Sequence, residues 1–234
     1  MRRVFLLIFG LGGCAALLTL LCITVAAQYV RLQMSPVECS QQQIIQQISF
    51  PCRVEDTGLL AVRLASYDGP FLEDGSDEEV TGVAALVVEN IGEDMVYEGA
   101  VILSQGGRFL VFEVMALPPG GCALVLEKDR CPYALADIDS CWGWVERGSG
   151  LMPQNLGVQQ LGRASLLFSN LTEDTICEAT VLFKSYDPVS GMYIGGIAYS
   201  VRVGELAPGE VRLVTPYHYA SGYSKVVGIL PKES

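Results

Sequence analysis

GVAALVVENIGEDMVYEGAVIL, residues 82–103, has a second copy in the same chain. The second copy reads GRASLLFSNLTEDTICEATVLF and occupies residues 162–183, an offset of 80 residues with no gap. Eight of the 22 aligned positions are identical, and most of the others exchange one apolar residue for another. Similarity at a fixed offset over this length indicates two copies of one structural unit.

Each copy has the composition of β-strands joined by tight turns. Residues 84–89 and 96–103 are rich in valine, isoleucine and leucine, and the Asn-x-x-Glu-Asp between them is turn sequence. Residues 108–115 and 122–126 supply the next two strands. The second copy predicts corresponding strands at residues 165–169, 176–183, 192–203 and 211–215. Short strands with frequent turns predict an all-β fold, with a sandwich in each copy rather than one up-and-down barrel.

The similarity extends beyond the two copies and indicates where the repeated units begin and end. Upstream, residues 60–67 align weakly with residues 140–147. Downstream, a Leu-x-Pro-Gly sequence precedes a strand in both copies, at residues 117–120 and 206–209. The second copy has about nine extra residues before this turn, around residues 186–191. The predicted units are residues 57–136 and residues 137–234.

This order of strand, asparagine turn, long strand and Leu-x-Pro-Gly turn resembles the small immunoglobulin-like repeats of bacterial surface proteins, such as the FxLYD and CARDB types. In those families an asparagine turn joins two strands and a Pro-Gly turn enters the closing strand. By this resemblance Asn90 and Asn170 take the first role, and Gly120 and Gly209 take the second. The resemblance implies two tandem immunoglobulin-like sandwiches that bind, space or assemble, and it implies no catalytic residues. The FxLYD signature itself is absent, and residues 182–187 only approach it.

An uncharged apolar segment begins at Val4 and ends at Ala27. As a helix its 24 residues span about 36 Å, against a hydrocarbon core of roughly 30 Å. Two arginines precede the segment, and positive charge stays on the cytoplasmic side of a membrane, so we expect the rest of the chain outside. Residues 1–31 are therefore predicted to be a signal anchor or transmembrane helix. Residues 32–56 are predicted to be a linker, either a stalk or a short packed helix.

The alternative prediction for the apolar segment is a cleaved signal peptide. Val25, Ala26 and Ala27 have the small-residue spacing of a signal-peptidase site, and cleavage after Ala27 would give a secreted protein. The segment is longer than the 7 to 15 apolar residues that are usual in a signal, which favours a retained single-pass anchor.

The charge of the predicted exterior region argues against one class of partner. Residues 32–234 hold 12 basic and 26 acidic residues, a net charge of −14. This sign repels a phosphate backbone, so nucleic-acid binding is not expected.

Eight cysteines divide between the apolar segment, which holds two, and the exterior region, which holds six. Six cysteines in an oxidising compartment predict disulfides. Short spacing favours the pairs Cys39–Cys52 and Cys131–Cys141. Zinc is not expected, because the chain has no Cys-x-x-Cys and only one histidine, His218.

Two tryptophans, Trp142 and Trp144, alternate along a predicted strand and so share one face. We favour a core position for them in the second sandwich, with an exposed pair that binds sugar or protein as the alternative. The acidic run at residues 73–79 is expected to be a solvated loop, with a calcium site as the alternative. Asn170 begins a glycosylation sequon but aligns with Asn90, so a turn role is expected first.

Motifs of catalysis are missing from the sequence. It has no nucleophile elbow and no phosphate-binding loop, and any histidine-based triad must use His218, which we expect to be structural. The sequence predicts a non-enzymatic, membrane-tethered extracytoplasmic binding or spacer protein, with no cofactor, metal ligand or catalytic residue. We expect a protein partner or a cell-surface ligand. One alternative is an accessory subunit of an envelope complex, and another is an envelope enzyme.

Overall fold

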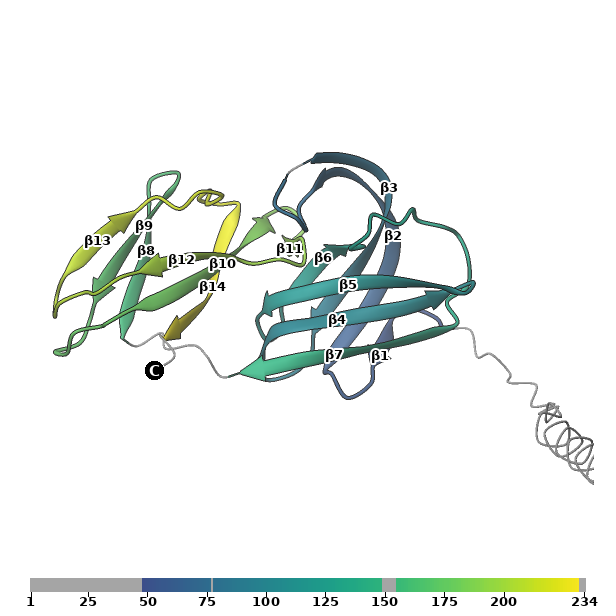
Figure 1. Cartoon of the computed structure of the whole chain (residues 1–234), viewed down its shortest axis with the longest axis horizontal. Helices are drawn as coiled ribbons and strands as arrows, with labels where there is room; N and C mark the ends of the chain where they lie inside the picture. The colour runs from purple at the N-terminus through teal and green to yellow at the C-terminus, as the bar shows by residue number, and fades with distance from the viewer. Residues whose placement is uncertain (1–47, 77, 149–154, 232–234) are drawn as a thin grey trace, which may run out of the picture. The chain divides into compact units, whose positions relative to one another are not determined.

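The computed structural model describes residues 48–76, 78–148 and 155–231, all within one compact unit, Ile45–Ser234. The regular elements of this part are β-strands in several largely antiparallel sheets (Figure 1). The prediction of an all-β fold is therefore confirmed. The predicted membrane segment lies outside the described residues, and none of the described residues form a helix long and apolar enough to cross a membrane.

The first half of this unit consists of two facing layers of strands. One layer has the order β1 (Cys52–Val54), β2 (Leu59–Phe71), β3 (Glu78–Asn90), β6 (Cys122–Leu126). The other has the order β5 (Arg108–Leu117), β4 (Met95–Gln105), β7 (Ser140–Gly148). Leu86, Val101 and Phe112 come from both layers and are fully buried in one apolar cluster. The core of the first half therefore lies between the two layers.

The second half pairs its strands in the same order. One layer has the order β8 (Leu156–Leu161), β9 (Ser165–Asn170), β13 (Val211–Val214). The other has the order β12 (Tyr199–Val203), β10 (Ala179–Asp187), β14 (Ser224–Pro231). Phe168 and Phe183 are buried between these layers. Every strand of the first half except β1 thus has a counterpart in the second half.

Strand pairing corrects the limits that the sequence suggested. β7 pairs with β4, with Trp142 opposite Ile102, so residues 140–148 belong to the first half rather than to the second. The true counterpart of β2 is β8, because Leu59 pairs with Asn90 and Leu156 pairs with Asn170. The upstream alignment of residues 60–67 with 140–147 is therefore wrong.

The end of the predicted linker also belongs to the sheet structure. Ile48 forms an antiparallel bridge with Ile138, and β1 pairs with β2. Val54 is buried in the core of the first half. Residues 48–54 are thus packed against the first half, whereas residues 32–47 lie outside the described residues.

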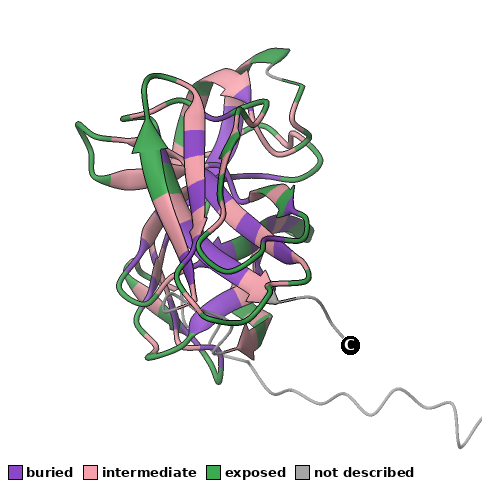
Figure 2. Cartoon of the chain, turned by 90° about the vertical axis from the view of Figure 1, so that its left-hand side faces the viewer, coloured by how far each residue is buried: buried purple, intermediate pink, exposed green. Residues whose placement is uncertain are grey.

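Alternation of side chains explains the two-layer packing. Along β5, Leu110, Phe112 and Val114 are buried, whereas Phe109 and Glu113 point to solvent. Figure 2 shows buried and exposed segments succeeding one another along the strands. A strand with this period covers a core with one face and meets solvent with the other.

A short strand joins the two halves. The sequence predicts one strand over residues 192–203, but the structure divides it into β11 (Met192–Ile194) and β12. β11 pairs in parallel with β6 of the first half, where Tyr193 lies opposite Ala123, and antiparallel with β10. This strand follows the extra residues that distinguish the second copy from the first. The insertion therefore supplies a connection that the first copy lacks.

Candidate functional site

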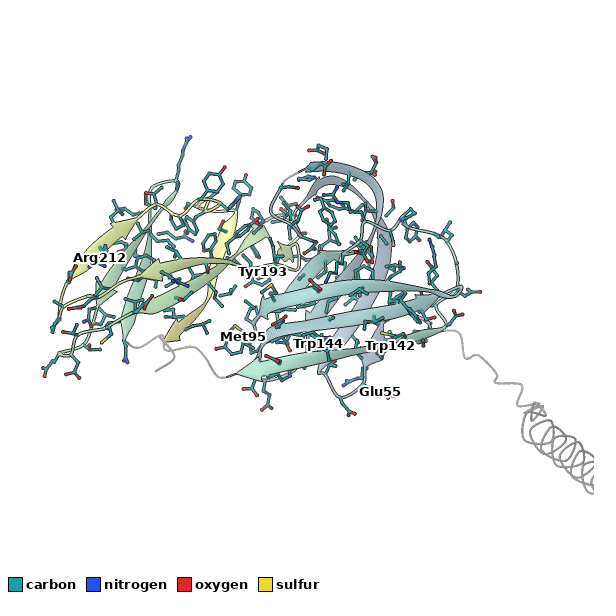
Figure 3. The ribbon with its side chains drawn as sticks, in the orientation of Figure 1. Glu55, Met95, Trp142, Trp144, Tyr193 and Arg212 are labelled. Carbon is teal, nitrogen blue, oxygen red and sulfur yellow. The ribbon has the colours of Figure 1, made fainter. Side chains whose placement is uncertain are left out.

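The outer face of the β5–β4–β7 sheet carries exposed aromatic side chains. Trp142 and Trp144 lie on β7, 40% and 46% exposed (Figure 3). The prediction that they close the core of the second sandwich is therefore wrong in both position and burial. The alternative, an exposed pair that binds a ligand, stays a prediction.

Side chains that lie opposite one another on β5, β4 and β7 form rows across the sheet, and these rows extend the tryptophan pair into an apolar surface. Trp142, Ile102 and Val111 stand side by side on the three strands. Phe109 on β5 is 62% exposed, and its ring meets that of Trp142 edge to face, with 5.6 Å between ring centroids. Phe109 was not predicted from the sequence, because it comes near Trp142 only when β5 and β7 both pair with β4. We call this surface the aromatic face; it consists of Phe109, Val111, Ile102, Trp142 and Trp144.

The next rows border the aromatic face with acidic side chains. Trp144 shares a row with Ala100 and Glu113, and the small Ala100 is covered by its neighbours. The following row contains Glu98 and Glu146. All three glutamates are exposed. The face therefore combines an apolar surface with a negative border.

A charged pocket of about 450 Å³ adjoins this border at Glu113. Its walls are formed by Phe71, Glu73, Asp74, Glu113, Leu126, Lys128, Asp129 and Arg130. The Lys128 ammonium donates to the Glu113 carboxylate, and this contact raises the pKa of Lys128. Four carboxylates against two cations leave the pocket with an excess of negative charge.

The acidic run at residues 73–79 divides between surface and interior. Arg130 lies over the ring of Phe71 and forms ion pairs with Asp74 at 2.8 Å and Glu78 at 2.6 Å. Glu73 instead points inward, toward the junction of the two halves. In the described part of the chain, no cluster of three or more histidine, cysteine or acidic side chains is placed to hold a metal ion. The structure thus supplies no observation for the calcium alternative.

The junction holds a fully buried lysine, Lys184 on β10. Its Nζ donates three hydrogen bonds to carbonyl oxygens, at 2.8 Å to Met115, 2.8 Å to Gly196 and 2.7 Å to Ile197. The Glu73 carboxylate accepts from the N–H of the same Gly196 at 2.7 Å. Gly196 therefore connects a buried cation with a buried acid, and the three acceptors match the three N–H groups of an ammonium.

Gly196 has no room for a side chain. A Cβ at this position would lie 1.8 Å from the carbonyl oxygen of Glu113. We expect Gly196→Ala to lower the free energy of unfolding by about 1–3 kcal/mol, because the backbones of the junction must move apart. Urea unfolding followed by circular dichroism measures this loss. Gly204→Ala is the matched control, since its Cβ would meet nothing nearer than 3.6 Å, and equal losses in both variants would contradict the prediction.

Burial shifts the titration of both junction groups. Desolvation lowers the pKa of Lys184 from 10.5 to about 7, against the opposing charge of Glu73. Desolvation also raises the pKa of Glu73, and hydrogen bonds from Leu126 and Gly196 oppose that rise. The charged form of each group is therefore disfavoured by burial and favoured by its partners.

The lowered pKa of Lys184 predicts that the free energy of unfolding depends on pH. Between pH 7 and 10.5 the unfolded chain keeps a proton on Lys184 that the folded chain has lost. The free energy of unfolding should therefore rise with pH in this window, by up to about 1.4 kcal/mol per pH unit. Urea unfolding at successive pH values measures the slope. Lys128→Met should keep the slope and Lys184→Met should lose it, so equal slopes in these two variants would contradict the prediction.

His218 lies in a second pocket, of about 570 Å³, lined by residues of the second half and by Leu72 of the first half. Its ring stacks on the ring of Tyr199, with 4.6 Å between the centroids, and meets the ring of Tyr217 edge to face, with 4.4 Å between the centroids. The described residues that line this pocket offer hydroxyl and aromatic groups but no carboxylate or thiol. The pocket therefore shows no acid or thiol to complete a triad with His218.

Two cysteines meet in the first half. The side chains of Cys52 and Cys141 hydrogen-bond to each other. The backbone N–H of Cys131 instead donates to the Glu127 carboxylate at 2.7 Å. The neighbour of Cys141 is thus Cys52, not the Cys131 that spacing suggested, and Cys39 lies outside the described residues. The described cysteines are all free thiols in the structure.

Comparisons of this chain with protein-family models, with curated proteins and with solved structures find no match.

Proposed function

We propose that this chain is a non-enzymatic, membrane-tethered binding protein of the cell exterior that presents the aromatic face to a partner protein. The observation that carries the proposal is the exposure of Phe109, Trp142 and Trp144 on adjoining rows of one sheet. Contiguous exposed apolar patches mark interaction sites, and large aromatic side chains supply much of the binding energy at the centres of interfaces.

The border of the face indicates the chemistry of the partner. Glu98, Glu113 and Glu146 lie beside the two tryptophans, and the adjoining pocket carries further carboxylates. Charged rims steer association toward surfaces of opposite sign. The partner we infer is therefore a protein surface with apolar side chains flanked by lysine or arginine, rather than a neutral glycan.

The architecture supports a display role. The two halves repeat the strand orders β2–β3–β6 and β5–β4–β7 as β8–β9–β13 and β12–β10–β14, which is consistent with two tandem immunoglobulin-like sandwiches. The apolar segment that ends at Ala27, preceded by two arginines, supports a tether with the sheets outside. A binding protein held in this way also serves as an accessory subunit if its partner belongs to an envelope complex.

Site-specific photo-crosslinking in the intact envelope tests the proposal. Phe109 is replaced by p-benzoylphenylalanine, which keeps an aromatic ring on the face. We expect irradiation to give one discrete adduct with a protein. The adduct should decrease by about tenfold or more when Trp142→Ala and Trp144→Ala are added, because two central aromatic contacts are lost. It should also decrease as salt rises, because the negative border is screened.

The control places the same photo-reactive residue at Val189, which is 94% exposed in the second half. Equal adducts from both positions, or none from Phe109, would refute a binding role for the aromatic face. A heterogeneous polysaccharide adduct would refute the protein partner. A membrane-impermeant amine reagent reports the location separately, since exposed Lys128 should react before the membrane is lysed.

A further inference from the structure

Cys52 and Cys141 occupy facing edges of the two layers in the first half. Cys52 begins β1, the edge strand of one layer, and Cys141 lies on β7, the edge strand of the other. Their side chains hydrogen-bond to each other, and both are partly buried against the same apolar core. Two residues further along each strand, a Cβ on Gly143 would lie 3.0 Å from Cγ1 of Val54. The two strands therefore approach closely where the sulfurs meet.

We propose that Cys52 and Cys141 form a disulfide that joins the two layers of the first half in the mature protein. This inference rests on the proposed location outside the cytoplasm, where disulfides form and persist. The link would close a far longer loop than the pairs favoured by spacing, Cys39–Cys52 and Cys131–Cys141. A longer closed loop restricts the unfolded chain more, so this pair has the larger effect on stability.

The chemistry is thiol–disulfide exchange with an oxidised protein or small-molecule disulfide. One of the two thiols, for example that of Cys52, loses its proton first, because the thiolate is the nucleophile. The Cys52 thiolate attacks one sulfur of the oxidant, forms a mixed disulfide and expels the other sulfur as a thiolate. Cys141 then loses its proton and attacks the Cys52 sulfur, which expels the second thiolate. The chain loses two protons and two electrons, and the oxidant becomes two thiols.

Tryptic mapping distinguishes this pair from the pairs that spacing favours. Cleavage at arginine places Cys39 and Cys52 together in peptide 32–53. It places Cys131 and Cys141 together in peptide 131–147. The spacing-based pairs leave the two peptides separate, whereas a Cys52–Cys141 disulfide joins them.

The test uses the full-length chain, alkylated without reductant and then extracted in detergent. Variants Cys39→Ser and Cys131→Ser are combined so that only Cys52 and Cys141 remain to join the two peptides. We expect a joined species that reduction separates and that is lost when Cys52→Ser or Cys141→Ser is added. Recovery of both peptides with Cys52 and Cys141 alkylated would overturn the proposal.

A second experiment tests whether the two sulfurs lie close enough to pair, independently of where the chain lies in the cell. The purified chain, fully reduced, is treated with oxidised glutathione, and we expect the same joined species. If the joined peptides form with oxidised glutathione but not in the cell, the proposal that the mature protein contains this disulfide is wrong. Amine labelling of Lys128 then shows whether the proposed location is also wrong. No joined species in either arm overturns the pairing itself and leaves the crosslinking result for the aromatic face unaffected.

Discussion

Replacing Lys184 by methionine should lower the free energy of unfolding by about 3–5 kcal/mol, the usual loss when one partner of a buried charge network is removed. Methionine keeps most of the buried volume, so the loss reports the lysine nitrogen and its three hydrogen bonds rather than packing. Without this nitrogen, the carbonyl oxygens of Met115, Gly196 and Ile197 lose a donor, and the buried Glu73 carboxylate loses the positive charge that lowers its pKa. Urea unfolding at pH 6.5, followed by circular dichroism, measures the change.

Two further variants identify the source of the loss. Lys128→Met removes an exposed lysine paired with Glu113 and should cost far less than Lys184→Met, because solvent screens an exposed ion pair. Adding Glu73→Gln to Lys184→Met should give a smaller loss than the sum of the two single changes, because the acid left unpaired by the first change is then neutral. If Lys184→Met costs no more than Lys128→Met, the buried ammonium does not hold the junction.

The strands of the matched copies were predictable because turn residues and apolar runs specify them locally. Residues 122–126 form a strand with the predicted limits, and Gly120 and Gly209 adopt the left-handed conformation expected of the Pro-Gly turns, with φ of 66° and 69°. The break between β11 and β12 was not predictable, because β11 depends on pairing with β6, about 70 residues earlier in sequence. The same is true of β7, whose sequence alone does not select β4 as its partner.

The orientation of the tryptophans depended on packing that a sequence does not display. Alternation correctly placed Trp142 and Trp144 on one face but left the choice of face open. Gly143 points inward, where a Cβ would lie 2.2 Å from the Ala100 carbonyl oxygen and 3.0 Å from Val54. The inner side of β7 therefore has no room for an indole. Lys184, in contrast, had a visible signal as a lysine within an apolar strand, residues 179–184, and was overlooked.

Asn90 and Asn170 have the same buried role in the two copies. In the first, Nδ2 donates to the carbonyl oxygens of Asp94 and Leu117, each at 2.9 Å. In the second, Nδ2 donates to Asp174 at 2.8 Å and Leu206 at 3.0 Å. Each amide thus ties the asparagine turn to the first residue of its Leu-x-Pro-Gly turn. Because both donors of Asn170 are used in a buried site, the folded chain does not offer this amide to glycosylation at the sequon.

Asn90→Ala and Asn170→Ala should therefore each lower the free energy of unfolding by about 2–4 kcal/mol. The two hydrogen bonds that Nδ2 donates and the two that Oδ1 accepts are lost, and a buried carbonyl oxygen is left without its donor. Asn→Asp at either position should be at least as harmful, because an acceptor then faces two acceptors. Gln159→Ala removes an exposed amide and should cost less than about 0.5 kcal/mol. Urea unfolding of each variant measures these losses. If Asn90→Ala were as stable as Gln159→Ala, the backbone conformation alone would determine the asparagine turn. The shared hydrogen bonds would then not explain why the two halves have the same fold.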